Sequence, residues 1–284
     1  MKKVLIIGGG GLLGSALAKE FSAGYLVVGL NREKFDITDE QNIREKLLSV
    51  APGLIINAAA YNGVDLTEKE EASYALAEEV NGFAVGRLAD FAADRGIPLV
   101  HFSTDYVFDG DNLDGYAEGA TPSPLNKYGY TKFLGERLLQ ENTARYYLIR
   151  LSRLFGRPGT SVQAKKSFVD IVIDLVENQG KKELKLVNEE VSSPTYSVDL
   201  ARLVRQLLDE QYPYGIYHGA NSGGCSWYEM AEKIFELKKL SVNLIPVTSK
   251  EYPRPAKRPP HSVLLNTKLP PARPWQEALA EYVA

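Results

Sequence analysis

Cysteine is almost missing from this sequence of 284 residues, which holds a single one, Cys225. One thiol cannot form a disulfide within the chain, so the small disulfide-framed secreted folds are excluded and a reducing, cytoplasmic compartment is expected. Long hydrophobic runs are also missing, because no stretch approaches the roughly 18 to 20 apolar residues that span a bilayer. The apolar run 4–7 ends at glycine and is too short for the core of a secretory signal. We therefore predict a cytoplasmic protein without a membrane segment.

An excess of charge of either sign is absent as well. The 33 lysines and arginines nearly balance 36 acidic residues, for a net charge of -3. Such a balance provides no electrostatic attraction to nucleic acid or to an anionic membrane, and we expect neither as a partner. Histidines are few, and His218 and His261 show no metal-ligand spacing with each other or with Cys225. We therefore expect no catalytic metal.

What the first half of the chain does contain is a regular alternation of strand and helix patterns. Short β-branched runs occupy 4–7, 25–29, 54–56, 98–102 and 146–150, and helical patterns occupy 12–21, 39–50, 70–94 and 125–141. This alternation predicts parallel strands joined by right-handed crossovers, hence a Rossmann-type, doubly wound α/β sheet. Periodicity alone does not exclude a (β/α)8 barrel, but a glycine-rich loop after the first strand favours the open sheet.

The second half is less regular. Helical patterns cover 167–178, 198–209 and 226–237, and strand patterns cover 184–187, 215–218 and 244–247. We predict an NAD(P)-binding Rossmann domain at 1–155 and a smaller α/β substrate-binding region at 156–284, some segments of which return to the main sheet. Ligands of open α/β sheets bind beyond the carboxyl ends of the strands, so the second half should cap that edge.

The glycine-rich loop lies directly between the first strand and the first helix. It reads Gly8-Gly9-Gly10-Gly11-Leu12-Leu13-Gly14, which contains both G-x-G-x-x-G and G-x-x-G-x-x-G. Glycines allow backbone N–H groups to approach a pyrophosphate at the positive N-terminus of the helix. We predict that Gly8, Gly11, Leu12 and Leu13 bind a dinucleotide; a glycine-rich turn without a ligand is the alternative.

The identity of the dinucleotide is suggested about 20 residues further on, where an acid often binds the ribose 2′-hydroxyl. Here the residues are Asn31 and Arg32. The carboxylate that would repel a 2′-phosphate is missing, and a guanidinium that can pair with one is present. We therefore predict NADPH as the preferred cofactor, with NADH possible, while a simple exposed turn is the alternative.

Tyr128 and Lys132 stand four residues apart in a helical segment, so they share one face of that helix. A phenol with an ordinary pKa of about 10 is a poor proton shuttle at neutral pH. A neighbouring ammonium stabilises the phenolate and lowers the pKa of the phenol. We predict that Tyr128 is a general acid whose pKa is lowered by Lys132. A tyrosine and a lysine at this spacing are common on helix surfaces, and it is the glycine loop earlier in the chain that favours a catalytic role for them.

Ser103 and Thr104 follow the strand pattern 98–102. A hydroxyl at this place, together with Tyr128 and Lys132, resembles the catalytic triad of the short-chain dehydrogenases/reductases. The segment 103–110, Ser-Thr-Asp-Tyr-Val-Phe-Asp-Gly, resembles the signature of the dTDP-4-dehydrorhamnose reductases, an extended branch of that superfamily. Further segments that resemble this family run along the whole chain, at 57–61, 124–129, 135–136, 193–195, 199–201, 215–218, 225–229 and 256–262.

The resemblance implies reduction of the 4-keto group of dTDP-4-dehydro-L-rhamnose by NADPH or NADH, which gives dTDP-L-rhamnose. It implies that Tyr128 donates the proton, that Lys132 also binds the nicotinamide ribose, and that Thr104 hydrogen-bonds the substrate carbonyl. The further cofactor contacts that it implies are Asp36, Ile37, Ala58, Ala59, Ala60 and Ser103. The expected substrate contacts are Thr104, Asp105, Tyr106 and Arg153, together with Trp227, which can stack on a base or sugar, and Arg258, which can pair bidentately with the diphosphate. A homodimer is expected on the same basis.

Several positions depart from the family pattern and bear on the sugar. Leu12 stands where glutamine is usual, Arg153 where many members have tryptophan, and Ser167 where asparagine is usual. Ser15 stands where some members carry an acid of a metal-bridged dimer, so that metal site is not expected.

Alternatives remain for single residues and for the whole protein. Arg258 can form a structural salt bridge, Trp227 can be a packed aromatic, and Asn81 can order water or brace a helix. The whole chain can also be an extended short-chain epimerase or dehydratase acting on another nucleotide sugar. A third interpretation is a non-catalytic partner similar to the regulatory subunit of methionine adenosyltransferase.

Overall fold

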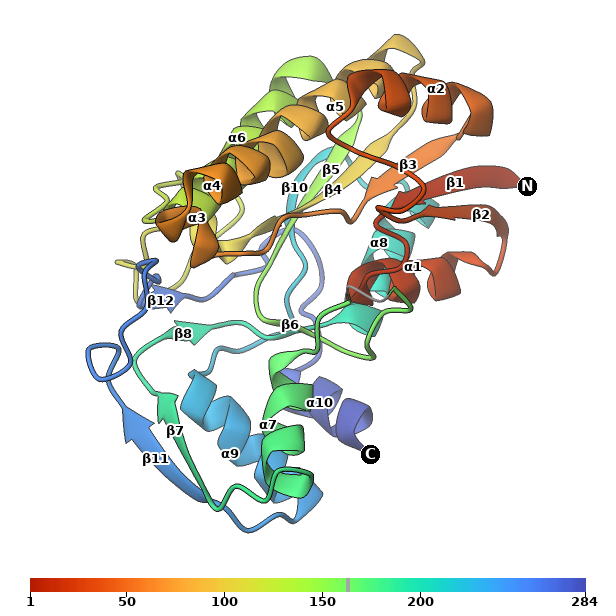
Figure 1. Cartoon of the computed structure of the whole chain (residues 1–284). Coiled ribbons are helices and arrows are strands. Elements are labelled where there is room, and N and C mark those ends of the chain that lie inside the picture. Colours follow the sequence, from red (N-terminus) through yellow and green to blue (C-terminus); the bar gives the residue numbers. More distant parts are fainter. Residues whose placement is uncertain (162–163) are drawn as a thin grey trace.

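The main sheet of the protein has six strands, all parallel, in the order β10-β5-β4-β3-β1-β2 (Figure 1). It is seen in a computed structural model that describes residues 1–161 and 164–284. The strands are β1 (Lys2–Ile7), β2 (Tyr25–Leu30), β3 (Leu54–Asn57), β4 (Leu99–Thr104), β5 (Tyr146–Leu151) and β10 (Gly215–His218). The order runs outward in both directions from β1, and β2 and β10 are open edges. The predicted doubly wound α/β class is therefore confirmed, and the barrel is excluded.

Helices cover both faces of this sheet. Figure 1 shows α2 (Glu40–Val50), α5 (Ala84–Asp94) and α6 (Lys127–Asn142) on one face, and α1 (Leu12–Phe21) and α8 (Ser197–Asp209) on the other. Val4 and Ile6 of β1 belong to the core on the side of α1 and α8, while Leu5 and Ile7 belong to the opposite core. Strands buried on both faces are continuously apolar, which is why β1 shows no alternation in its sequence.

The predicted long helix at 70–94 is divided in the structure. Its parts are α4 (Glu71–Glu78), a π-helical turn η1 (Glu79–Phe83) and α5, preceded by the short α3 (Leu66–Lys69). Asn81 lies in the π-helical turn, where its side chain is fully engaged with neighbouring segments, as described below. A π-helical turn re-aims side chains within a helix, and such turns are frequent at functional sites.

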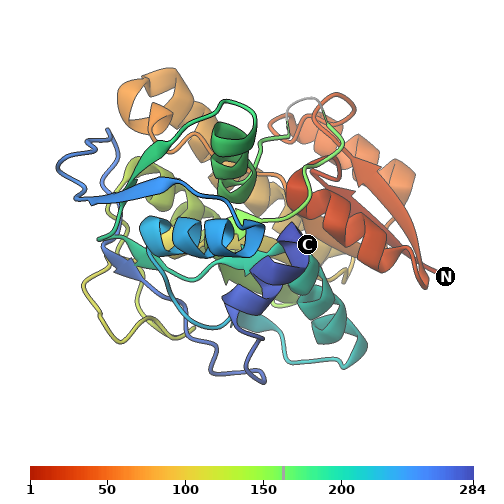
Figure 2. The ribbon, with the colours of Figure 1, turned by 90° about the horizontal axis from the view of Figure 1, so that it is seen from below.

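A second layer of structure lies against the carboxyl edge of the main sheet. Its helices are α7 (Phe168–Glu177), α9 (Trp227–Lys238) and α10 (Trp275–Val283). It also has three pairs of parallel strands: β7 (Glu183–Val187) with β11 (Asn243–Val247), β8 (Val191–Ser192) with β12 (His261–Ser262), and β6 (Leu154–Phe155) with β9 (Thr195–Tyr196). Val169, Ile234 and Leu279 belong to its separate core. Figure 2 shows this layer from below, with α9 between the strand pair β7–β11 and α10.

Two segments of the second half join the main sheet. β10 pairs with β5 at its edge, and α8 packs beside α1 on its face. Among the helices formed by residues 1–161 and 164–284, none combines the length and the apolar character that a bilayer crossing requires.

Candidate active site

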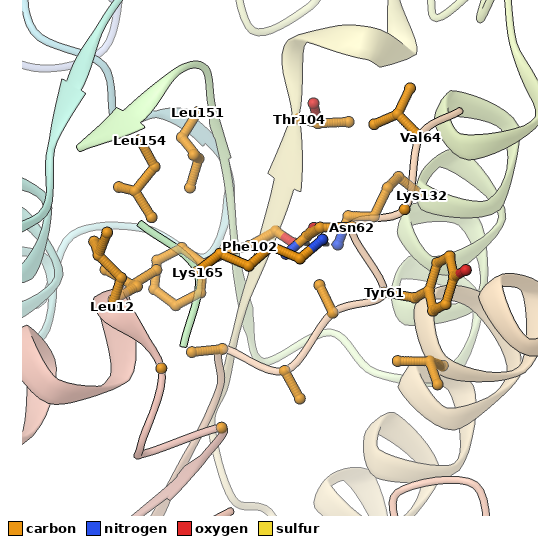
Figure 3. Close-up of a pocket in the computed structure, with 18 of the residues that line it drawn as sticks. Leu12, Tyr61, Asn62, Val64, Phe102, Thr104, Lys132, Leu151, Leu154 and Lys165 are labelled. Carbon is orange, nitrogen blue, oxygen red and sulfur yellow. Dashed lines mark hydrogen bonds between the residues drawn. The ribbon is translucent and has the colours of Figure 1, made fainter. Parts of the chain in front are cut away.

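A cavity of about 790 Å³ opens at the carboxyl edge of the main sheet, between the two layers. It is lined by the loops that follow β1, β2, β3 and β4, by the start of α6, and by segments of the second half (Figure 3). Every residue for which the sequence predicts a cofactor, catalytic or substrate role lines this one cavity. Parallel strands bring the loops at their carboxyl ends to one edge, which explains how positions far apart in the chain converge.

The glycine loop fits a pyrophosphate. Gly8 has a φ of +78°, and a Cβ atom there would lie 2.8 Å from a main-chain nitrogen of the loop after β3. A Cβ atom on Gly14 would lie 2.1 Å from the oxygen of Gly8, so glycine lets α1 begin directly against the loop. Gly11 caps α1 without a side-chain hydrogen bond, which leaves the N–H groups of Leu12 and Leu13 in the positive first turn open to an anion.

The far end of the cavity is formed by the loop after β2. Asn31, Arg32, Asp36 and Ile37 all line it. The carboxylate of Asp36 accepts hydrogen bonds from the main-chain nitrogen and the hydroxyl of Thr38, at 2.9 and 2.7 Å, which lower its pKa. Arg32 is exposed and forms no salt bridge within the described part of the chain. An unpaired guanidinium at this position suits a 2′-phosphate, so the geometry is compatible with NADPH.

Tyr128 is held at the first turn of α6, which begins where Asn126 accepts a hydrogen bond from the nitrogen of Gly129 at 2.7 Å. A Cβ atom on Gly129 would lie 2.2 Å from the main-chain oxygen of Tyr106, so this turn packs tightly against the segment after β4. The rings of Tyr106 and Tyr128 meet edge to face at 5.9 Å. The hydroxyl of Tyr128 lies 3.4 Å from Oδ1 of Asn62.

The prediction that Lys132 lowers the pKa of Tyr128 is wrong in this structure. Burial raises the pKa of Tyr128, and the carboxyl of Asp105 and the ring of Tyr106 add to the increase. The ammonium of Lys132 donates instead to the main-chain oxygen of Phe102, at 2.6 Å. Burial lowers the pKa of Lys132 to about 8 and outweighs the opposing effect of Glu136. At neutral pH Tyr128 therefore keeps its proton and Lys132 is mostly charged.

Thr104 lies at the end of β4, facing the start of α6. Its Oγ1 accepts a hydrogen bond from the nitrogen of Tyr106 and donates one to Oδ1 of Asp105, both at 3.2 Å. Asp105 is buried, which raises its pKa, and it accepts a hydrogen bond from the hydroxyl of Ser262 on β12 at 2.5 Å. The hydroxyl of Ser103 is buried without a partner among residues 1–161 and 164–284. Thr104 and Ser103 thus offer hydroxyl groups along the wall of the cavity.

Arg153 and Trp227 form the side of the cavity away from the sheet. Arg153 has a φ of +42°, in the left-handed region that is costly for a side chain other than glycine. Its guanidinium lies 4.0 Å above the ring of Trp227 and donates to the main-chain oxygens of Cys225, at 2.7 Å, and of Glu190. The indole nitrogen of Trp227 donates to the carboxylate of Glu190 at 3.3 Å. Trp227 is therefore a packed aromatic. Arg153 holds this side of the cavity together through its contacts with Trp227, Cys225 and Glu190.

Arg258 forms the structural salt bridge that the sequence left open. Two of its nitrogens donate to the carboxylate of Asp65, one of them at 2.8 Å, and these bonds lower the pKa of Asp65. The nitrogen of Ala256 donates to the same carboxylate at 3.1 Å. The pair ties the proline-rich segment 252–260 to the loop after β3. A diphosphate would have to compete with Asp65 for this guanidinium.

Asn81 acts as a brace. Its Oδ1 accepts a hydrogen bond from the nitrogen of Tyr61 at 2.9 Å, and its Nδ2 donates to the oxygen of Tyr61 and to Oγ1 of Thr131, at 3.0 and 3.1 Å. These bonds attach the loop after β3 to α6 and leave the side chain fully used. The loop that carries Asn62 is thereby held beside Tyr128.

Sequence reasoning missed several lining residues. Asn62 directly follows the nominated run 57–61, so extending that run would have found it. Ser262 ends the segment 256–262 that resembles the family, although no role was assigned to it. Glu190, Ser192 and Lys165 also line the cavity, but they stand in segments where no local pattern signals a pocket. Within the described ranges, no three His, Cys, Asp or Glu side chains converge in a way that could hold a metal ion.

Comparison with known proteins agrees with this geometry. The family model described as "RmlD substrate binding domain" matches residues 1–284. The spore coat polysaccharide biosynthesis protein SpsK of Bacillus subtilis (strain 168) is 38% identical over 288 residues, which cover 100% of this chain and 97% of that protein. The dTDP-4-dehydrorhamnose reductase of Aggregatibacter actinomycetemcomitans is 36% identical over 98% of this chain and 97% of its own length.

A solved structure matches equally well. The dTDP-4-dehydrorhamnose reductase of Bacillus anthracis, in complex with NADP, has a TM-score of 0.92 and 32% identity, over 99% of this chain and 98% of that one. These similarities extend over both layers of the protein and both sides of the cavity. The chain therefore belongs to the dTDP-4-dehydrorhamnose reductase family, that of the RmlD substrate-binding domain.

Proposed function

We propose that this protein is an NADPH-dependent reductase of the 4-keto group of dTDP-4-dehydro-L-rhamnose, with dTDP-L-rhamnose as the product. One observation carries the proposal: Thr104, Tyr128 and Lys132 line the same cavity as the glycine loop between β1 and α1. A dinucleotide held along the glycine loop and a carbonyl held at Thr104 would therefore share one enclosed space. The family and the activity named for its relatives support the same conclusion.

The cofactor would be held along the carboxyl ends of β1 to β4. The first turn of α1 would bind the pyrophosphate, and Asn31 and Arg32 would bind the ribose that carries the 2′-phosphate. Asp36 and Ile37 would border the adenine, and 58–60 with Ser103 would border the nicotinamide half. When bound, the nicotinamide supplies the hydride that adds to C4 of the sugar.

Tyr128 would supply the proton. Because burial raises its pKa, the phenol is protonated at neutral pH and can act as an acid. As the hydride adds to C4, the π electrons of the carbonyl move to its oxygen, which takes the proton of Tyr128. The phenolate that remains would be reprotonated from solvent. Lys132 would also bind the nicotinamide ribose.

Thr104 would stabilise the negative charge that develops on the carbonyl oxygen. A hydroxyl is effective in this role when it is fixed before the reaction begins. The hydrogen bond from the nitrogen of Tyr106 holds the Thr104 oxygen at the end of β4, and its one hydroxyl proton, donated to Asp105 in this structure, would turn to the carbonyl oxygen when the sugar binds. The sugar would lie between this point and the wall formed by Arg153, Trp227 and Arg258.

The proposal includes a division of labour along the chain, with residues 1–155 binding NADPH and residues 156–284 binding the nucleotide sugar. It also includes a cytoplasmic location and a homodimer. The buried free thiol of Cys225 is compatible with a reducing compartment. Light scattering on the purified protein would measure the mass of the particle and test the dimer.

Oxidation of NADPH, followed by its absorbance, tests the proposed activity. The substrate dTDP-4-dehydro-L-rhamnose would be generated in place, with NADH run in parallel. We expect rapid oxidation of NADPH and slower oxidation of NADH. The variant Tyr128→Phe is the control, and it should bind NADPH normally but lose turnover by roughly a hundredfold or more.

Two results would count against the proposal. Bound NADPH without oxidation would favour another sugar nucleotide, or the regulatory-partner interpretation if a synthetase copurifies. Tightly bound NAD in the purified protein would favour an epimerase or dehydratase, since those enzymes recycle their cofactor.

A further inference from the structure

The guanidinium groups at the substrate end of the cavity are already paired. Arg153 donates to the oxygens of Cys225 and Glu190 and lies flat on Trp227. Arg258 is paired with Asp65. A nucleotide sugar carries two negative charges on its diphosphate, and an anion in a partly enclosed cavity needs a paired cation. These two arginines are therefore poorly placed to supply it.

Lys165 is a cation of the cavity without such a partner. It belongs to the loop between β6 and α7, and it forms no ion pair in the part of the chain that the structure describes. Its side chain is exposed, and in the view of Figure 3 it extends into the cavity. The next residue, Lys166, points its ammonium to Asp174 on α7, 3.7 Å away. Both lysines line the cavity and are exposed, and they differ in that only Lys166 has an acidic partner among the described residues.

The loop that carries Lys165 is attached to the glycine loop. The nitrogen of Ser161 donates to the oxygen of Gly10 at 3.0 Å, and the nitrogen of Ala164 donates to the oxygen of Ser161 at 3.0 Å. A Cβ atom on Gly159 would lie 2.3 Å from the oxygen of Gly10, so the two loops are in direct contact. Lys165 therefore lines the cavity from a loop that contacts the cofactor loop.

We infer that Lys165 is a specificity-determining residue whose ammonium pairs with the diphosphate of the nucleotide sugar, an inference that rests on the proposed function. The cofactor pyrophosphate already has the N–H groups of the first turn of α1. The sugar reacts at C4 and carries its diphosphate on C1, across the same ring. A flexible cation that lines the same cavity as Thr104 and Tyr128 can therefore meet a diphosphate that is one sugar ring away from the reacting carbonyl.

Binding of dTDP, measured by titration calorimetry, tests the inference without any turnover. A charge-assisted hydrogen bond to a phosphate predicts that Lys165→Ala raises the Kd of dTDP by roughly tenfold to a hundredfold. Lys165→Arg keeps the charge and should restore most of the affinity. Lys166→Ala is the matched control and should bind dTDP like the wild type. The Kd of NADPH, from its fluorescence, should be the same in all four proteins.

Kinetics with the full substrate provide the second readout. We expect Lys165→Ala to raise KM for the nucleotide sugar by a similar factor and to change kcat less than about threefold, since the cation binds ground and transition states alike. Unchanged dTDP affinity in Lys165→Ala would overturn the inference even if the wild type reduces the substrate. Weaker NADPH binding with unchanged dTDP binding would also overturn it, by assigning Lys165 to the cofactor. If Lys165→Ala loses dTDP affinity but the wild type does not reduce the substrate, the role of Lys165 in binding the diphosphate stands and only the proposed reaction is overturned.

Discussion

The ammonium of Lys132 on α6 donates to the main-chain oxygen of Phe102 on β4, at 2.6 Å, and both residues line the cavity. This bond attaches the catalytic helix to the central strand of the site. It also keeps a charged group in a buried position, which lowers the pKa of Lys132 to about 8. Its charge interacts with two titratable groups, Glu136, one turn further on α6, and His101 on β4.

The first prediction concerns stability and pH. An ordinary lysine pKa is about 10.4, so between pH 8 and 10.4 the unfolded chain holds a proton at Lys132 that the folded protein lacks. Stability should therefore rise with pH across this window, by on the order of 3 kcal/mol from this group. Urea unfolding of the wild type and of Lys132→Met at several pH values measures this contribution as the difference between their unfolding free energies. The effects of the other titrating groups cancel in that difference. A difference that is flat between pH 7.5 and 10 would contradict the low pKa.

The second prediction concerns cofactor choice. If Arg32 pairs with the 2′-phosphate, Arg32→Ala should raise the Kd of NADPH by roughly fivefold to thirtyfold, because an exposed charge-assisted contact is worth about 1–2 kcal/mol. The Kd of NADH should not change. Lys34→Ala removes a neighbouring exposed cation that does not line the cavity, and it serves as the control. Equal effects of Arg32→Ala on both dinucleotides would remove Arg32 from 2′-phosphate recognition.

The third prediction concerns Gly14. An alanine Cβ at this position would lie 2.1 Å from the oxygen of Gly8, and neither main chain can move without disturbing the phosphate loop. We expect Gly14→Ala to weaken NADPH binding at least roughly tenfold, although alanine is normally about 1 kcal/mol better than glycine in a helix. Gly119→Ala is the control, because no atom lies within 4 Å of its added Cβ. A more stable Gly14→Ala with full NADPH affinity would refute the proposed contact.

The fourth prediction concerns a buried ion pair that supports α6. Arg150 on β5 donates to both carboxylate oxygens of Glu136, at 3.0 and 2.7 Å, and both side chains are buried. Arg150→Met leaves a buried carboxylate unpaired and should cost roughly 3–5 kcal/mol of unfolding free energy, measured with urea. The double variant Arg150→Met with Glu136→Leu should recover most of that loss.

The exposed pair of Arg137 and Glu141 on the same helix is the control for this measurement. Its removal by Arg137→Ala should cost less than about 1 kcal/mol. A similar cost at both sites would mean that burial does not govern the ion pair of Arg150 and Glu136.

Much of the architecture was determined by the sequence alone. Uninterrupted apolar runs such as 4–7 favour strands covered on both faces, and a glycine run directly after such a strand, at 8–14, favours a tight turn into a helix. These are local constraints of burial and backbone geometry, which is why the fold class and the cofactor loop were predictable. Tyr128 and Lys132 were predictable for the same reason, since helical spacing places them on one face.

The partners of the charged groups were decided by the tertiary structure. Whether Arg258 meets Asp65 or a phosphate, and whether Lys132 faces a phenol or the oxygen of Phe102, depends on segments that are far apart in the chain. The raised pKa of Tyr128 likewise results from burial by neighbours on β4 and η2 (Asp105–Val107), which no local pattern contains. Local spacing determines which side chains share a face. The energy of a charge depends on its surroundings in space, and only the folded chain supplies them.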